Sequence, residues 1–255
     1  MFAAGPAASA ELRYGTPPTN IAQRLERLRA AYPGTISAID GNTLRLADGT
    51  SIAISDGRTD KTFDELLNAP DIDDMFAFDY AAGAEPAQPA LDHDPGRIRV
   101  EALFRALYGD CNKSGAAPAM RKIAWVPGHG GGTVSFTTAQ GADKALEAVS
   151  RELDALPKSF RKYLVPSAGT YNCRSIAGTT RMSMHAYGAA IDISTKHTNY
   201  WQWVKPGPDG RYVWSNQIPM EIVSIFEKHG FVWGGRWYHF DTMHFEYRPE
   251  MLPPQ

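Results

Sequence analysis

The sequence has few cysteines, almost no net charge and no long apolar run. Its 26 basic and 28 acidic residues leave a formal charge of -2 at pH 7. That balance provides no basic surface of the kind that attracts duplex DNA or an anionic membrane. No stretch approaches the roughly 20 apolar residues that a membrane-spanning helix needs. We therefore expect no nucleic-acid partner and no membrane span.

The two cysteines and the first ten residues bear on the compartment. Cys111 and Cys173 are compatible with one disulfide in an oxidising environment, although two reduced, buried cysteines would look the same in sequence. The N-terminus is small and apolar and ends in Ala8-Ser9-Ala10, the A-x-A pattern that signal peptidase cleaves, but it lacks a positively charged beginning. We interpret residues 1–10 as a residual export signal or a disordered tail. A periplasmic or extracellular location with a disulfide is expected.

Turn signals and apolar periodicity divide the chain into parts. Asn20 can cap a helix that ends at Pro33-Gly34, and alternation over residues 35–55 predicts a small antiparallel meander. Thr62 with Glu65 forms a capping box for a brief helix. The meander is either a small binding domain or a brace on the rest. The expected parts are a tail (1–10), a helix and β-meander segment (11–80), an Ala/Pro-rich linker (81–96) and a catalytic domain (97–255).

The last of these parts mixes helices with antiparallel strands. Apolar residues recur at helical spacing over 100–108, 142–156 and 219–229. Residues 123–126 and 134–136 are expected to form one sheet with later strands. Without a regular βαβ alternation or an internal repeat, the fold class is α+β, a small antiparallel sheet flanked by helices.

The segment from Ser183 to Asp192 combines a histidine and an aspartate with small residues between them. If residues 188–192 form a strand, Ala190 and Asp192 share one face, and Gly188 can let the chain turn so that His185 lies beside Asp192. A small-residue floor that leads to a carboxylate is suited to a metal site. Taken alone, however, such a pair is more often a surface pair.

A second segment places Asp241 three residues before His244. A zinc peptidase needs three protein ligands, an open position for water and a carboxylate that is not itself a ligand. His185, Asp192 and His244 supply two imidazoles and a carboxylate for one Zn²⁺ per chain, although other first-row ions also fit such a site. Asp241 is then free to act as the catalytic base. Glu246 is a rival, either as a ligand or as a hydrogen-bond partner of one.

These two segments together resemble a known family. The order SxHxxGxAxD, followed about fifty residues later by DxMHFE just after a Trp-Gly-Gly, is similar to the D-alanyl-D-alanine carboxypeptidase family of zinc peptidases. That family includes the vancomycin-resistance D,D-peptidases and phage L-alanyl-D-glutamate endolysins, and the resemblance covers roughly residues 163–247. It implies that His185, Asp192 and His244 bind zinc, that Asp241 is the catalytic carboxylate, and that the substrate is a peptidoglycan stem peptide. An aspartate at the base position is more like the endolysin branch, so the bond that is cut stays open, as does the choice between endopeptidase and carboxypeptidase action.

The resemblance also directs attention to residues before the first ligand. Arg174 lies where the family keeps an arginine that faces the substrate, and its guanidinium could polarise the scissile carbonyl or bind a carboxylate. The alternative is a surface arginine in a weak ion pair. Ser183 and Arg181 are weaker candidates, for hydrogen bonding at the site or for contact with substrate.

Two other functions remain as alternatives. A non-catalytic module could keep zinc and bind the cell wall, but it would not need the free carboxylate of Asp241. A serine hydrolase could use His129 in its glycine-rich segment, yet the chain has no G-x-S-x-G nucleophile elbow, and a flexible loop is the better interpretation. Aromatic residues between the ligand segments either line a groove or fill the core. His197, His229 and His239 are expected to have no role in the site, although His239 could lie near the metal. The oligomeric state stays open.

Overall fold

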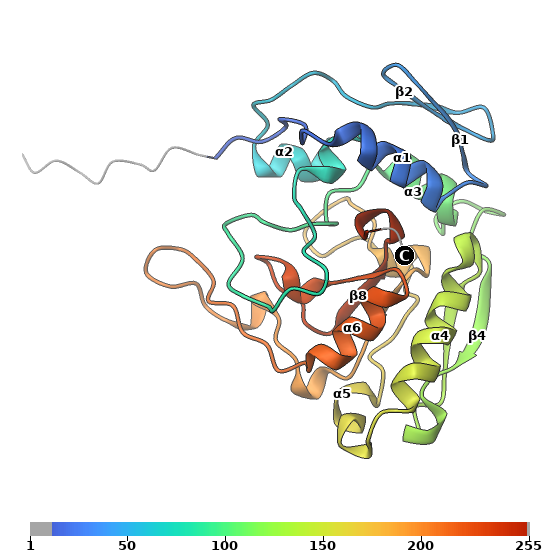
Figure 1. Ribbon diagram of the computed structural model, residues 1–255, viewed down its shortest axis with the longest axis vertical. Helices are drawn as coiled ribbons and strands as arrows, with labels where there is room; N and C mark the ends of the chain where they lie inside the picture. The colour runs from blue at the N-terminus through green and yellow to red at the C-terminus, as the bar shows by residue number, and fades with distance from the viewer. Residues whose placement is uncertain (1–11, 254–255) are drawn as a thin grey trace, which may run out of the picture.

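The protein is α+β, as expected. A computed structural model describes residues 12–253, and within that range three small antiparallel sheets are surrounded by helices (Figure 1). The signal expected at residues 1–10 lies outside the described residues. In chain order the elements are α1 (Ile21–Ala31), β1 (Ile36–Asp40), β2 (Thr43–Leu46), β3 (Ser51–Ala53), α2 (Phe63–Asn68), α3 (Glu101–Tyr108), β4 (Met120–Ala124), β5 (Thr133–Thr137), α4 (Ala142–Asp154), α5 (Arg161–Leu164), β6 (Ala190–Asp192), α6 (Met220–Lys228), β7 (Phe231–Trp233) and β8 (His244–Tyr247).

The N-terminal segment contains the predicted helix, meander and capping box. Strands β1, β2 and β3 pair antiparallel in that order, and Thr62 and Glu65 cap α2 reciprocally. The expected cap of α1 is wrong in one detail. The side chain of Asn20 accepts a hydrogen bond from Nε of Arg24 at 2.7 Å and makes no capping bond to the backbone. The charged guanidinium has taken the oxygen that a helix cap would use.

The strands of the larger domain form two sheets, whereas we expected one. β4 and β5 make a separate hairpin, and the second sheet has the order β6-β8-β7. β5 ends at Thr137, whose backbone N–H donates to the Gly188 carbonyl at 3.0 Å. Gly188 has a φ of +65°, and a Cβ there would lie 2.7 Å from the sulfur of Met120. The chain therefore turns at this glycine before β6 begins, and the β5 ladder does not continue.

The β6-β8-β7 sheet lies between two hydrophobic cores. One core contains Ile191 and Phe245 together with buried residues of α4 and α6. The other contains Ala190 and Val232, on the opposite face of the same strands, together with buried residues of α1, β1 and β2. The N-terminal segment therefore packs on the larger domain through a shared core, and it covers the sheet face that carries Ala190 (Figure 1).

The Ala/Pro-rich stretch is attached along its length to the larger domain. The backbone N–H of Gly83 donates to the Glu227 carboxylate at 2.9 Å. The indole N–H of Trp237 donates to the Pro95 carbonyl at 2.7 Å. Hydrogen bonds to a buried carboxylate of α6 and to a buried indole hold this stretch against the larger domain.

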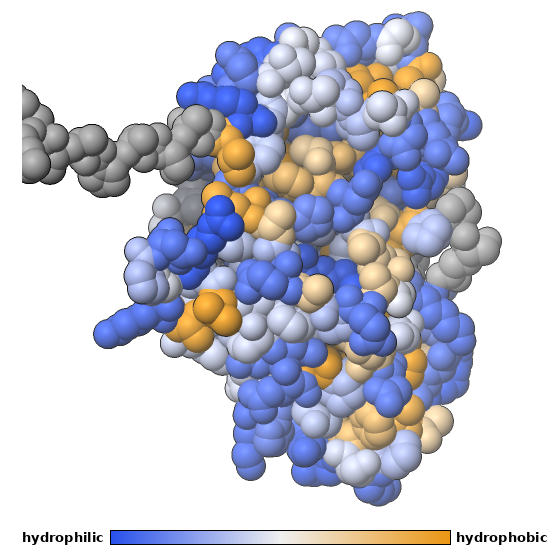
Figure 2. All heavy atoms as spheres, turned by 60° about the vertical axis from the view of Figure 1, so that its left-hand side comes forward, coloured by the Kyte–Doolittle hydropathy of each residue, from blue (hydrophilic) through white to orange (hydrophobic). Residues whose placement is uncertain are grey.

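None of the helices in residues 12–253 combines the length and apolarity that crossing a bilayer requires. The face shown in Figure 2 is mostly hydrophilic, with hydrophobic residues in small separate patches.

Candidate metal centre and cleft

Strand pairing brings the second and third proposed ligands together. In the antiparallel register of β6 and β8, Asp192 is directly opposite His244, and Ala190 is opposite Glu246. Because side chains alternate along a strand, His244 and Glu246 project from the same face. This is the face that the N-terminal segment covers.

The first proposed ligand comes from the short 3₁₀ turn before β6. This turn spans Met184–Tyr187, and the Ser183 hydroxyl accepts a hydrogen bond from the His185 backbone N–H at 3.3 Å. The turn ends at Gly188, whose positive φ redirects the chain into β6. The rings of His185 and His244 then meet edge to face, with centroids 5.0 Å apart. As the sequence predicts, the turn at Gly188 brings His185 beside strand β6.

The donor atoms of the three side chains converge on one point. Nε2 of His185 is 3.2 Å from Oδ2 of Asp192, and Nδ1 of His244 is 2.8 Å from Oδ1 of the same carboxylate. One ligand atom from each of the three residues lies within 4.8 Å of the others. A tetrahedral zinc ion with bonds of about 2.0–2.2 Å separates its ligand atoms by roughly 3.4 Å. The three residues fit such an ion with small adjustments.

The hydrogen bonds of His185 leave its Nε2 available to a metal ion. Its Nδ1 is 2.8 Å from the Thr170 carbonyl oxygen, which can only accept, so the proton is on Nδ1. In the neutral ring, Nε2 then has a bare lone pair that faces an oxygen of Asp192. Two acceptors at 3.2 Å require a proton or a metal ion between them.

Glu246 lies behind His244 as a buried carboxylate. Its Oε1 is 3.0 Å from Nε2 of His244 and 3.4 Å from the Arg99 guanidinium. Burial alone would raise the pKa of Glu246, but Arg99, His244 and Arg248 together lower it to about 2. The ionised carboxylate accepts the Nε2 proton of His244, which leaves Nδ1 directed at Asp192. This contact suits a residue that orients a ligand more than a ligand itself.

Asp241 is close to the cluster without being part of it. Its backbone carbonyl accepts the His244 N–H at 3.2 Å, and its own N–H donates to the Gly234 carbonyl at 3.0 Å. Its Oδ1 is buried and has no hydrogen-bond partner among residues 12–253. Burial raises the pKa of this carboxyl to about 6, and the nearby Asp192 also raises it. A carboxyl with a pKa near neutrality and a free oxygen is suited to proton transfer.

Arg174 and Ser183 lie on two paired stretches ahead of the ligands. The Ser183 N–H donates to the Arg174 carbonyl at 3.2 Å. Cys173, next to Arg174, forms a disulfide with Cys111, so the reduced alternative does not hold. The Arg174 side chain is exposed and donates to the Ser175 carbonyl at 3.3 Å. The disulfide fixes the backbone beside this arginine, while its guanidinium stays accessible at the cleft.

One cleft of about 520 Å³ gathers every candidate that the sequence singles out for metal or substrate. These residues are Arg174, Arg181, Ser183, His185, Asp192, Asp241, His244 and Glu246. Tyr200 and Trp201 also line it, whereas Trp203, in the same 3₁₀ turn as Trp201, is 60% exposed and does not. The aromatic cluster therefore contributes to the cleft only in part.

Several lining residues escaped sequence reasoning. Phe63 and Leu67 of α2 reach the cleft, as do Arg97 and Arg99, which directly follow the linker. His239, which the sequence left open as a residue near the metal, lines the cleft and stacks on the Phe63 ring with centroids 5.8 Å apart. For the arginines, the sequence did offer a signal, because two such residues directly follow an Ala/Pro-rich stretch. For Phe63 and Leu67 it offered none, because their position depends on how the N-terminal segment packs on the larger domain.

His129 lies apart from this cleft. It is only 3% exposed, in the short 3₁₀ turn Pro127–His129, and it does not line the cleft. Its backbone N–H donates to the Asp154 carboxylate at 3.1 Å, and its carbonyl accepts from Arg161 at 2.8 Å. The flexible loop expected here is a packed turn, because polar groups of α4 and α5 satisfy its backbone.

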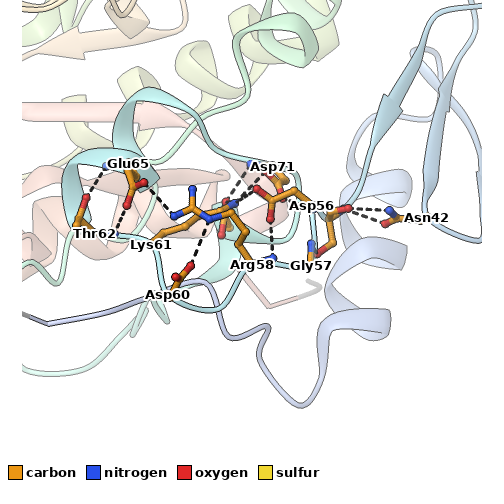
Figure 3. A network of polar contacts seen from close by, with 11 residues as sticks. Asn42, Asp56, Gly57, Arg58, Asp60, Lys61, Thr62, Glu65 and Asp71 are labelled. Carbon is orange, nitrogen blue, oxygen red and sulfur yellow. Dashed lines mark hydrogen bonds and ion pairs between the residues drawn. The ribbon is translucent and has the colours of Figure 1, made fainter.

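A second acidic group, Asp71 with Asp73 and Asp74, also has the spacing of a metal site. Lys61 already supplies the positive charge there. Its Nζ lies 2.5 Å from Asp74, 3.0 Å from Asp71 and 3.1 Å from Asp56, and its side chain is 1% exposed (Figure 3). This internal ion-pair network ties the start of α2 to the following turn.

Comparison with known proteins agrees with this geometry. Residues 177–247 match the model of the D-alanyl-D-alanine carboxypeptidase family. The peptidase segment so defined contains His185, Asp192, Asp241 and His244, but Arg174 lies before it. The resemblance inferred from the sequence is thereby confirmed, and it supports a peptidase that acts on peptidoglycan. No curated protein and no solved structure matched the chain.

Proposed function

We propose that the protein is an exported zinc peptidase that hydrolyses an amide bond in peptidoglycan stem peptides. The observation that supports this most is the convergence of His185, Asp192 and His244, in which a ring nitrogen of each histidine faces an oxygen of the same carboxylate. The free buried oxygen of Asp241 beside this cluster supports catalysis more than storage of a metal.

The three converging side chains would hold the ion through two imidazoles and one carboxylate. A bound zinc ion would supply Lewis-acid activation of water and of the substrate carbonyl. Asp241 accepts a proton as the nucleophile forms and returns it to the leaving amine, a role for which a pKa of about 6 is well placed. Arg174, accessible at the cleft, is proposed to hold the substrate carbonyl or a carboxylate.

Location and domain organisation belong to the same proposal. The disulfide between Cys111 and Cys173 supports an oxidising compartment, the periplasm or the cell exterior. We assign catalysis to residues 97–255 and bracing to residues 11–80, because the latter share a core with the sheet that carries the site. The linker at 81–96 then also closes one side of the cleft, since Asp92 and Asp94 line it.

The test combines metal analysis with digestion of purified muropeptides. Wild type, Asp241→Ala and Asp209→Ala are compared, the last being a matched control because Asp209 is exposed and lies outside the cleft. We expect about one zinc per chain in all three, stem-peptide fragments from wild type and the control, and none from Asp241→Ala. Fragment masses would name the bond. Zinc without any cleavage by wild type would favour a cell-wall-binding module, and absence of zinc would refute the metal centre.

A further inference from the structure

Arg181 is a cation in the cleft with no anionic partner. Its Nε and one terminal guanidinium nitrogen are buried and lack any hydrogen-bond partner in residues 12–253, and it takes part in no ion pair there. Burial, together with the charges of Arg99 and Arg97, lowers the pKa of Arg181 to about 10. A buried donor left unpaired costs about 1–3 kcal/mol, more when it is charged, so this group is ready to accept an anion.

Two further arginines flank it in fixed positions. Arg99 donates to the Met182 carbonyl at 3.1 Å and pairs with Glu246 at 3.4 Å. Arg97 donates to the His239 carbonyl at 3.1 Å and has only a long contact with a carboxylate, 3.6 Å from Asp94. Each of these two arginines therefore has a carboxylate within 4 Å, whereas Arg181 has none among residues 12–253 and feels Asp64 and Asp94 only from a distance.

The three arginines separate two cavities. All three line the cleft of about 520 Å³ that contains the metal centre, and all three also line a cavity of about 330 Å³. The second cavity is walled by the C-terminal end of α2 and the residues after it, Leu67 to Pro70, and by the start of α3. A substrate held at the metal centre can thus extend toward guanidinium groups that the N-terminal segment covers.

We propose that Arg181, with Arg97 and Arg99 beside it, is a subsite for a carboxylate of the substrate. It deepens the proposed function and rests on it, because stem peptides carry carboxylates at the C-terminus and on D-glutamate. A guanidinium binds a carboxylate through two parallel hydrogen bonds, which supplies both charge and orientation. The subsite selects acidic peptides over their neutral amides, and residues outside the peptidase segment help to form it.

Paired peptides that differ by one carboxylate test the proposal. The first pair is Nα,Nε-diacetyl-L-lysyl-D-alanyl-D-alanine and its C-terminal amide. The second is N-acetyl-L-alanyl-γ-D-glutamyl-L-lysine amide and its D-isoglutamine counterpart. We compare four proteins: wild type, Arg181→Gln, Arg181→Lys and the exposed control Arg151→Gln. For each we measure kcat/KM and the binding of the same peptides by calorimetry.

We expect wild type and Arg151→Gln to prefer the acid of one pair by about 10–100-fold, mainly through KM. The acid-to-amide ratio falls toward one in Arg181→Gln and is partly kept in Arg181→Lys. The pair that discriminates identifies the carboxylate. An unchanged ratio in Arg181→Gln would overturn the subsite. If wild type cuts none of the four peptides, the proposed function fails on them, and the acid-to-amide ratio of the binding constants in wild type and Arg181→Gln decides the subsite.

Discussion

Two clusters in this protein bring several ligand-type side chains together, and they differ in where their positive charge comes from. Asp56, Asp71 and Asp74 surround Lys61, a cation that belongs to the chain. The cluster of His185, Asp192 and His244 has no lysine or arginine bonded to its donor atoms among the described residues, and it opens on a cleft. The comparison teaches that the first cluster already contains its own cation, whereas the second has the donor atoms and the open side that our proposed zinc site requires.

Removing one carboxylate from each cluster gives the largest expected contrast. Asp192→Ala deletes a proposed ligand, so we expect loss of zinc and a fall in hydrolysis of at least about 10³-fold, because metal-assisted stabilisation of the transition state is worth several kcal/mol. Asp71→Ala leaves Lys61 with two carboxylates and should keep zinc and activity. Elemental analysis and muropeptide digestion measure both. Zinc retained in Asp192→Ala would contradict the proposal that Asp192 is a metal ligand.

Removing the built-in cation should affect folding instead. Lys61→Met leaves the buried carboxylate of Asp74 without its partner, and we expect a loss of about 3–5 kcal/mol in the free energy of unfolding, measured in urea. Lys144→Met, at an exposed position of α4, is the matched control and should change little. Zinc content should stay at one per folded chain. A stability equal to wild type would mean that the Lys61 network is not structural.

The contact behind His244 sharpens the comparison. Glu246→Gln removes the negative charge that accepts the Nε2 proton of His244, so zinc affinity should weaken about 10–100-fold. Competition with a chelator of known affinity gives the dissociation constant. Glu147→Gln, an exposed carboxylate on α4, is the control. Abolition of zinc binding, as severe as in Asp192→Ala, would instead make Glu246 a ligand.

The sequence predicted which residues meet at the candidate site better than it predicted which elements wall the cleft around them. Asp192 and His244 could be placed because period-two alternation and a turn at Gly188 are local properties. The separation of β5 from β6 could not be predicted, since it depends on the same glycine packing on Met120. The contribution of Phe63 to the cleft depends on packing across more than a hundred residues, for which a single sequence carries no pattern.

The smallest expected effect concerns pH and again separates the clusters. An oxygen of Asp74 contacts Lys61, whereas the buried Oδ1 of Asp241 has no partner in the described part of the chain. In the metal-free protein the pKa of Asp241 is raised to about 6, first by burial. As a base it must be ionised, so kcat/KM of the metal-bound enzyme should fall about tenfold per pH unit below the pKa of Asp241, which a bound cation places below 6.

The sign for stability is opposite to that for activity. In metal-free protein, a raised pKa means that the contribution of Asp241 to stability is fully present below the pKa of an unfolded aspartate, about 3.9. That contribution is lost as the pH rises through about 6. Urea unfolding of metal-free wild type and Asp241→Asn between pH 4 and pH 7 isolates the contribution of Asp241 to the free energy of unfolding, because the amide does not titrate. Parallel curves for the two proteins would show that burial does not raise the pKa of Asp241, and its assignment as the base would lose this support.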